Sequence, residues 1–323
     1  MRYPLFLVRQ LGHTVSKKVV RTGARHLPFL GKDGNRRLER WLRGREDWRK
    51  LRLADAVVVS FGKSGRTWLR VLLSRVYQLQ HGLGEREVIG FDNLHYRTGA
   101  VPKIMFTHDN YVKDYTGHRD TKEDFYHKKV IFLARDPRDV AVSQYFQWKY
   151  RMKPNKKDIN AYPTLDLAPF EFVMSDTGLP KVIEFMNLWA KEAQRIREFM
   201  IVRYEDLRAA PEATLGRILE FLGTPATEAQ IADAVRFASL DNMKRMEQQR
   251  VFWLSGGRLV PKDRSNPNSY KVRRGKVAGY RDDFDAVQLA AIDRLVETTL
   301  DPLYGYTRAT EGQGGDKALE GAA

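Results

Sequence analysis

A glycine-punctuated loop between a β-branched run and an amphipathic helix carries residue types that bind phosphate. The loop is residues 62–67 (Gly-Lys-Ser-Gly-Arg-Thr), and it follows residues 56–60, a run typical of a buried parallel strand. Backbone N–H groups and the dipole at a helix N-terminus favour an anion at such a turn. Lys63 adds a positive charge, while Ser64 and Thr67 add hydroxyl donors. The sequence therefore predicts a phosphate-binding loop.

The loop shares the letters Gly-Lys-Ser with the Walker A loop of nucleoside triphosphatases but not its spacing. The Walker pattern requires a glycine five positions before Gly62, and Val57 stands there, inside the predicted strand. A further predicted strand, residues 130–134, leads into Arg135 rather than into an acidic residue that would hold Mg²⁺. A Mg–ATP-dependent small-molecule kinase on a related P-loop fold stays as an alternative, which metal-dependent ATP turnover would reveal.

Two further segments place cations where they can hold another phosphate. Arg135 ends a predicted strand and Ser143 lies two turns into the following helix, so the two side chains can clamp one phosphate. Near the C-terminus, residues 273–276 read Arg-Arg-Gly-Lys. Taken alone, this run is a basic loop, and most such loops are only solvated.

The three segments together resemble the sulfotransferases that use 3′-phosphoadenosine-5′-phosphosulfate (PAPS). The first is similar to that family's Tyr-Pro-Lys-Ser-Gly-Thr-Thr-Trp loop, with Phe61-Gly62 in place of Tyr-Pro and Arg66 in place of the first Thr. The second is similar to the family's 3′-phosphate motif, Arg-Asn/Asp-Pro-Lys/Arg-Asp followed by a Ser. Residues 273–284 are similar to the loop Arg-Lys-Gly-x-x-Gly-Asp-Trp-Lys-Asn-x-Phe, with Ala-Gly-Tyr where the family has Gly-Asp-Trp.

With two shorter matches, the resemblance spans about residues 57–284, which is most of the body. Residues 203–207 resemble a segment ending in Tyr-Glu-Asp-Leu, whose Tyr lies near the adenine, and residues 103–108 resemble the strand ending in Thr-His that delivers the base. The cytosolic branch of the family often has a Lys at the position of Phe106 and Leu-Pro at positions 109 and 110. The departures imply a different acceptor pocket.

The resemblance implies in-line transfer of a sulfuryl group from PAPS to a hydroxyl acceptor without a metal. It assigns Lys63 to the leaving group and His108 to the general base, with Asp109 as its orienting partner or its replacement. No His/carboxylate spacing in the sequence suggests a zinc site. The residues expected to bind PAPS are Lys63, Ser64, Gly65, Arg66, Thr67, Trp68, Arg135, Ser143, Tyr204, Arg273, Arg274 and Gly275.

The elements that must position these residues alternate between strands and helices. Strands are predicted at residues 56–60, 103–107, 130–134 and 200–203, and helices at 138–150, 181–199, 211–222 and 287–300, besides the helix that follows the loop. This order favours a single α/β domain, residues 53–307, with a central, mostly parallel sheet flanked by helices. Long polar stretches at 109–129, 151–169 and 256–283 are expected to be lids or disordered segments. The tail, residues 308–323, is predicted to be disordered.

Composition excludes several classes of protein. The 323 residues are 42% apolar and contain no cysteine, which excludes disulfides, thiolate catalysis and iron–sulfur clusters. The net charge is +16, and residues 1–52 hold most of it, with 15 Lys or Arg against 4 Asp or Glu. Anionic partners are therefore expected.

Residues 1–52 are predicted to form a basic helical extension. Val8, Leu11, Val15 and Val19 recur at helical spacing, which fits either a helix on an anionic membrane surface or a helix packed on the body. A second basic helix is predicted at residues 35–51. The membrane alternative makes a carbohydrate or lipid-linked glycan the favoured acceptor.

The sequence predicts a cytoplasmic protein, with a peripheral membrane position left open. The longest early apolar run, Leu5 to Val8, is far below the roughly 20 residues that a membrane-spanning helix needs. No aromatic stacking platform supports sequence-specific nucleic-acid binding. A non-enzymatic basic protein that binds membranes or nucleic acid is the second alternative, and the oligomeric state, a homodimer included, is left open.

Overall fold

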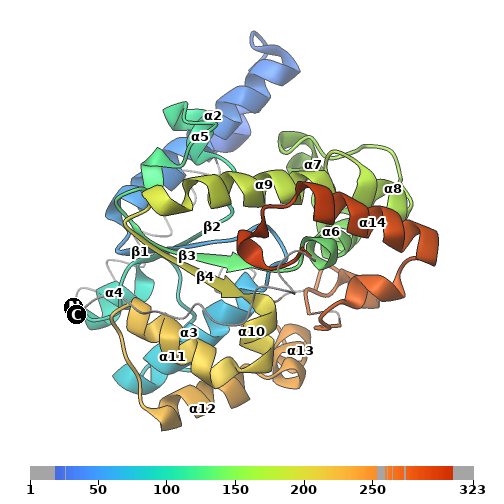
Figure 1. Ribbon diagram of the computed structural model, residues 1–323. Coiled ribbons are helices and arrows are strands. Elements are labelled where there is room, and N and C mark those ends of the chain that lie inside the picture. The colour runs from blue at the N-terminus through green and yellow to red at the C-terminus, as the bar shows by residue number, and fades with distance from the viewer. Residues whose placement is uncertain are drawn as a thin grey trace.

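A parallel four-stranded sheet runs through the centre of the computed structural model, with helices on both faces (Figure 1). The structure describes residues 19–25, 27–252, 259, 261–263, 265–272 and 274–307. The strands lie in the order β2-β1-β3-β4 and pair in parallel. They are β1 (Ala56–Val59), β2 (Ile104–Thr107), β3 (Lys129–Ala134) and β4 (Glu198–Arg203). The predicted α/β class with a parallel sheet is confirmed.

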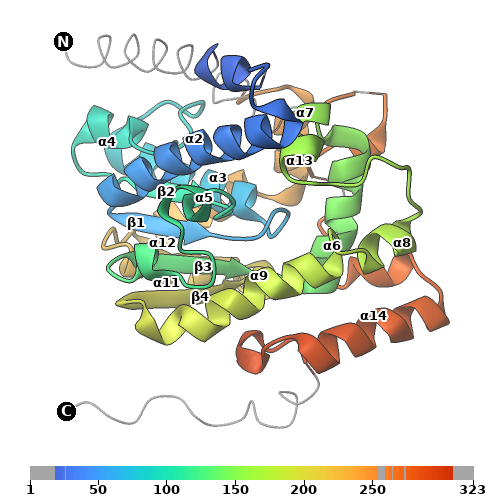
Figure 2. The same cartoon turned by 90° about the horizontal axis from the view of Figure 1, so that it is seen from above.

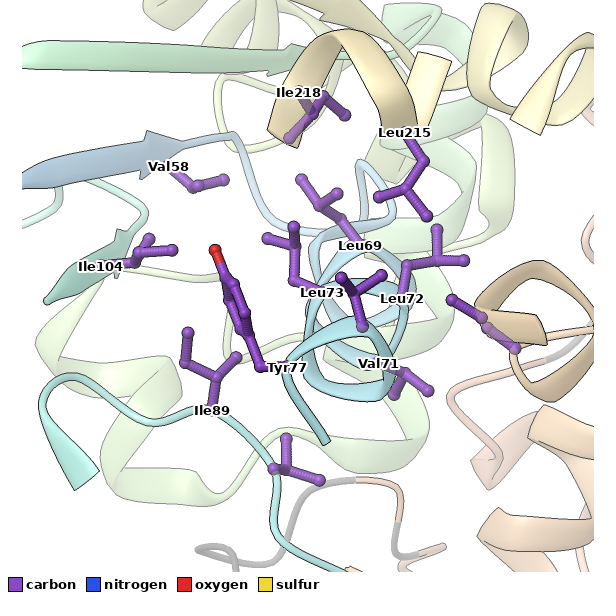
Figure 3. Close-up of a cluster of buried hydrophobic side chains, with 14 of the residues drawn as sticks. Val58, Leu69, Val71, Leu72, Leu73, Tyr77, Ile89, Ile104, Leu215 and Ile218 are labelled. Atoms are coloured by element: carbon purple, nitrogen blue, oxygen red, sulfur yellow. The ribbon is translucent and has the colours of Figure 1, made fainter. Parts of the chain in front are cut away.

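The pleat of the strands divides their apolar residues between two cores. Val58 and Ile131 point into one core, whereas Val57 and Phe132 point into the other. Figure 3 shows Val58 facing the buried side chains of Leu69, Leu73 and other residues of the helix that follows β1. Because both faces are covered, the strands consist of continuous apolar runs instead of alternating ones.

The helices have the following bounds. They are α2 (Gly31–Leu53), α3 (Arg66–His81), α4 (Asn93–Thr98), α5 (Val112–Thr116), α6 (Pro137–Phe146), α7 (Pro154–Ile159), α8 (Pro169–Met174), α9 (Leu179–Glu192), α10 (Tyr204–Ala209), α11 (Pro211–Phe221), α12 (Glu228–Phe237), α13 (Leu240–Gln248) and α14 (Ala286–Thr299). Single turns are η1 (Glu123–Phe125), the π-helical η2 (Gln147–Arg151), η3 (Ala193–Arg195), η4 (Pro267–Ser269), η5 (Gly279–Asp282) and η6 (Pro302–Tyr304). Helices α3, α11 and α12 cover one face of the sheet, and α6, α9 and α14 lie on the other (Figure 1).

Two predicted helices end earlier than expected. The helix predicted at residues 181–199 ends at Glu192, and its last residues belong to η3 and to the start of β4. The Glu192 carboxylate accepts a hydrogen bond from the Lys122 N–H at 3.2 Å, and the Arg197 N–H donates to the Tyr126 carbonyl at 2.8 Å, so the chain turns into the sheet here. The helix predicted at 138–150 ends as α6 at Phe146 and continues as the wider turn η2.

The long polar stretches hold short helices instead of remaining irregular. Residues 109–129 contain α5 and η1, residues 151–169 contain α7 and end at the start of α8, and the described part of 256–283 contains η4 and η5. The expectation that these stretches are disordered is therefore wrong for the parts that hold these helices. Each of these segments contributes residues to the wall of a cavity at the carboxyl edge of the sheet, and α7, η4 and η5 are the helices among them that line it.

The second basic helix packs on the body of the protein. It is α2, and Trp41 and Trp48 contact Tyr115 of α5 with ring centroids 5.2 and 5.4 Å apart. A Cβ at Gly44 would lie 2.2 Å from the Tyr111 carbonyl oxygen, so only glycine permits this approach. The predicted apolar stripe from Val8 to Val19 lies outside the described residues except for Val19, as does the predicted disordered tail. Within the described ranges, no helix has both the length and the apolar character required to cross a bilayer.

Candidate active site

The predicted phosphate loop forms a strained turn between β1 and α3. Lys63 has a φ of +78°, which is unfavourable for a side chain other than glycine, and such strain is typical of functional sites. Gly65 has a φ of +91°, and a Cβ there would lie 2.6 Å from Cδ2 of Tyr204. The turn therefore requires glycine at position 65, and it places the N-terminus of α3 at the carboxyl edge of the sheet.

The carboxyl ends of all four strands open onto one cavity of about 690 Å³. Ligands of open parallel sheets bind at this edge. Most of the predicted site residues line the cavity: Lys63, Gly65, Arg66, Thr67, Trp68, His108, Arg135, Ser143, Tyr204, Arg274 and Gly275. Ser64 is buried beneath the loop and is not among the lining residues, and Arg273 lies outside the described residues.

Arg135 holds three segments of the site together. Its guanidinium donates to the Lys63 carbonyl at 3.1 Å, to the Lys276 carbonyl at 3.2 Å and to Asp139 at 3.3 Å. It also lies over the Tyr204 ring, 4.5 Å from the ring centroid. The phosphate loop, the start of α6 and the C-terminal basic run are thus brought to one place, as the sequence predicted.

The cavity carries an excess of positive charge. Burial, assisted by Lys271, Arg151 and Arg135, lowers the pKa of Lys63 to about 7. Burial, assisted by Arg66 and Arg151, likewise lowers the pKa of Lys271 to about 7. Crowded cations of this kind are stabilised when an anion binds between them. The cavity is therefore built for an anionic ligand.

Two cations of the cavity wall, Lys271 and Arg151, were not singled out in the sequence, and neither was Glu247, which holds them. The buried Glu247 of α13 accepts hydrogen bonds from the N–H groups of Lys271 at 2.7 Å and Val272 at 2.9 Å, and it forms an ion pair with Arg151 at 3.5 Å. This carboxylate fixes the chain just before the basic run and holds Lys271 and Arg151 at the cavity wall. The residues that Glu247 binds lie far from it along the chain, so no local sequence motif identifies Glu247.

His108 faces the cavity as a neutral imidazole. Its Nδ1 lies 2.8 Å from the Ser60 carbonyl and its Nε2 lies 2.6 Å from Nη2 of Arg66. Because a guanidinium only donates, Nε2 holds the lone pair and Nδ1–H donates to Ser60. Burial and the neighbouring Arg66 hold the pKa of His108 well below its usual value. The lone pair on Nε2 therefore accepts the hydrogen bond from Arg66 in this structure.

Asp109 points away from the cavity. Its carboxylate is buried and lies 2.7 Å from Nζ of Lys122, which is also buried. Although this ammonium opposes the effect, burial raises the pKa of Asp109. Asp109 does not line the cavity, and its contacts stabilise the fold. Across the part of the chain that the structure describes, no group of three or more His, Asp or Glu residues is arranged to hold a metal ion.

Comparisons with known proteins agree with this geometry. The sequence model of the sulfotransferase domain matches residues 53–304. Sulfotransferase 2A6 of Mus musculus is 23% identical over 78% of this chain and 85% of its own length. Cytosolic sulfotransferase 13 of Arabidopsis thaliana is 25% identical over 76% of this chain and 77% of its own length.

Solved structures show the same fold. The structure of mouse sulfotransferase SULT7A1 complexed with PAP matches with a TM-score of 0.52 and 18% identity over 81% of this chain and 88% of that one. Retinol dehydratase in a complex with retinol and PAP matches with a TM-score of 0.50 and 19% identity, over 80% and 85% of the two chains.

The solved structures and the sheet order define an α/β fold with a P-loop-like turn after its first strand. The chain belongs to the sulfotransferase domain family, whose model covers most of its length. Because the chain belongs to this family, the two alternatives from the sequence, a kinase and a non-enzymatic basic protein, are rejected in favour of a sulfotransferase.

Proposed function

We propose that this enzyme transfers the sulfuryl group of PAPS to a hydroxyl acceptor. The observation that carries the proposal is that Lys63, Arg135 and His108, from three different strand ends, line one cation-rich cavity at the N-terminus of α3. The PAP bound in the similar structures supports PAPS as the donor. The plant relative's name supports a cytoplasmic location, and the family match supports a catalytic domain at residues 53–307 behind the basic extension 1–52.

The residues of the cavity fit the donor. The loop N–H groups and Thr67 can hold the 5′-phosphate, while Arg135, Ser143 and the Arg274 segment can hold the 3′-phosphate. Tyr204 and Trp68 lie edge to face with ring centroids 5.8 Å apart and offer an apolar wall for the adenine. PAPS, when bound, supplies an activated sulfuryl group.

The transfer step follows from the positions of Lys63 and His108. The acceptor oxygen forms a bond to sulfur while the bond from sulfur to the 5′-phosphate oxygen breaks, and its electron pair stays on the phosphate. The Lys63 ammonium stabilises the charge that builds up on this leaving oxygen. His108 Nε2 takes the proton of the attacking hydroxyl. The acceptor becomes a sulfate ester, and adenosine 3′,5′-bisphosphate (PAP) is released.

Calorimetric titration of the protein with PAP, ADP and Mg–ATP tests the donor. We expect PAP to bind without a metal and at least tenfold more tightly than ADP, because only PAP carries the 3′-phosphate. Arg135→Met should weaken PAP binding more than ADP binding. Binding that requires Mg–ATP, or equal affinity for PAP and ADP, would overturn the assignment of PAPS and of Arg135.

The affinity for PAP should fall as the pH rises above 7. Lys63 and Lys271, with pKa values of about 7 in the free protein, become more basic when the anion binds, so the complex holds more protons than the free protein. By linkage, affinity decreases above pH 7 by up to about tenfold per pH unit for each lysine. Titrations at pH 7.5 and 8.5 in two buffers of different ionisation enthalpy measure this proton uptake. The second pKa of a phosphate is about 6, so the nucleotide itself contributes little in this range.

A Lys271→Met variant provides the control for that pH dependence. It should lose part of the proton uptake while keeping PAP bound, because the loop and Arg135 stay in place. A pH-independent affinity in the unsubstituted protein would show that these lysines do not face the nucleotide.

A further inference from the structure

The cavity extends beyond His108 into a chamber lined by polar, basic and aromatic side chains. Its wall comes from α2, from the start of α5, from α7 and the loop after it, and from α9; α7 lies beside α2 (Figure 2). We call this part the acceptor chamber and define it by six lining residues: Asp47, Tyr111, Lys153, Lys156, Tyr162 and Lys181. Lys156 is close enough to His108 to lower its pKa further, so the chamber adjoins the transfer point.

The lysines of the acceptor chamber face neutral groups. Nζ of Lys181 donates to the Asn160 carbonyl at 3.4 Å and lies 5.1 Å from the centroid of the Tyr162 ring. Nζ of Lys156 lies 5.7 Å from the centroid of the Tyr111 ring. Among the described residues, neither lysine forms an ion pair with a carboxylate.

The carboxylates around the chamber offset these charges only in part, because Glu39 and Asp47 raise the pKa of Lys156 and Glu184 raises that of Lys181, but burial outweighs them. Glu39 of α2 is occupied by Arg25 and Arg43, each at 2.5 Å, and Asp114 of α5 is paired with Arg40 at 2.7 Å. Asp47 is the acidic residue of the chamber wall, and burial, opposed by the charge of Lys50, raises its pKa.

Both lysines are partly buried, which makes their positive charge costly in the free protein. Burial, followed by the charge of Arg43, lowers the pKa of Lys156 to about 8, and burial, followed by the charge of Arg40, lowers that of Lys181. A buried cation without a partner is unfavourable unless an anion arrives. Two such cations lie in one chamber beside the rings of Tyr111 and Tyr162. Together they form a site for an anionic group that belongs to a larger molecule.

We propose that the acceptor carries, besides its reacting hydroxyl, a phosphate or carboxylate group that Lys156 and Lys181 bind in the acceptor chamber. The inference rests on the proposed sulfuryl transfer and names the substrate class of that same site. Tyr111 and Tyr162 contact the body of the acceptor, so that its hydroxyl reaches His108. The enzyme thus adds a sulfate to a compound that is already an anion, a phosphorylated or uronic sugar being the simplest kind.

Binding to the PAP-saturated enzyme tests this inference without knowledge of the natural acceptor. The full chain is first titrated with PAP, and then separately with glucose 6-phosphate, glucuronate and glucose. We expect both anions to bind at least tenfold more tightly than glucose. The double variant Lys156→Gln, Lys181→Gln should lose this preference, and the double Arg variant should retain it. The ratio of the affinities for glucose 6-phosphate and glucuronate shows whether the chamber prefers a phosphate or a carboxylate.

A matched control variant and the titration with PAP distinguish a failure of the acceptor inference from a failure of the proposed function. Lys191→Gln changes an exposed lysine on the same helix as Lys181 and should leave the preference for anions intact. PAP binding in each variant shows that the protein is folded. If PAP binds but the anions bind no better than glucose, or if the double Gln variant keeps the preference, the acceptor inference is overturned while the donor assignment stands. If PAP fails to bind to the unsubstituted enzyme, the proposed function itself fails.

Discussion

Replacement of Lys63 by Met is expected to lower kcat about 10³-fold while the protein stays folded. In the proposed step, the leaving phosphate oxygen gains negative charge, and removal of one preorganised donor at such an oxygen costs about 10²–10³-fold. Lys63 lies on the strained turn between β1 and α3 and lines the cavity. The backbone of this turn therefore determines where the ammonium group of Lys63 lies. PAP binding should weaken much less than turnover, because Arg135 and the loop N–H groups remain.

The same substitution is expected to stabilise the protein. The pKa of Lys63 is about 7 in the folded chain and near 10.4 in an unfolded one, so the unfolded chain binds more protons between these values. The free energy of unfolding therefore rises with pH from 7 to 10, and at pH 7 the buried ammonium opposes folding. Met removes this cost. Single-turnover transfer and thermal unfolding at pH 7 measure the two effects, with Lys191→Met as the control at an exposed site. A kcat within threefold of the unsubstituted enzyme would remove Lys63 from the leaving group.

The sequence predicted the sheet because local residue patterns determine its central strands. Val57 to Val59 and the run around Phe132 are continuous and apolar, as strands buried on both faces require. The end of α9 could not be predicted in this way. Apolar residues continue beyond Glu192, and the chain leaves the helix because Glu192 and Arg197 bind Lys122 and Tyr126, which lie far earlier in the sequence.

The site shows the same division between local and distant determinants. The phosphate loop and Arg135 lie at strand ends, where spacing along the chain is enough to identify them. Lys271 and Arg151 are brought to the cavity by Glu247, and Arg66 reaches His108 across 42 positions of sequence. Only the folded chain shows these contacts. The choice between His108 and Asp109 was likewise open, because adjacent residues after a strand point in different directions.

Replacement of His108 by Asn is expected to lower the rate of transfer by about 10²–10⁴-fold, the usual contribution of a general base. The tautomer of His108 places its lone pair on Nε2, where the acceptor hydroxyl would take the place of Arg66, and Asn lacks a comparable base. PAP binding should be unchanged. Arg66→Thr removes the cation beside the ring and should raise the pKa of His108. A proton NMR titration of the free protein measures this change as a higher pH at the midpoint of the titration of the His108 ring resonance.

The matched variant for the neighbouring carboxylate is Asp109→Asn. It leaves the buried Lys122 ammonium without its charge partner, and breaking such a pair costs about 3–5 kcal/mol of stability. Folded Asp109→Asn protein should nevertheless transfer sulfuryl groups at nearly the normal rate, because this side chain does not reach the cavity. Rapid transfer by His108→Asn together with slow transfer by folded Asp109→Asn would reverse the assignment and move the proton to the carboxylate. The expected pattern separates a group that accepts the proton from one that only holds the loop after β2 in place.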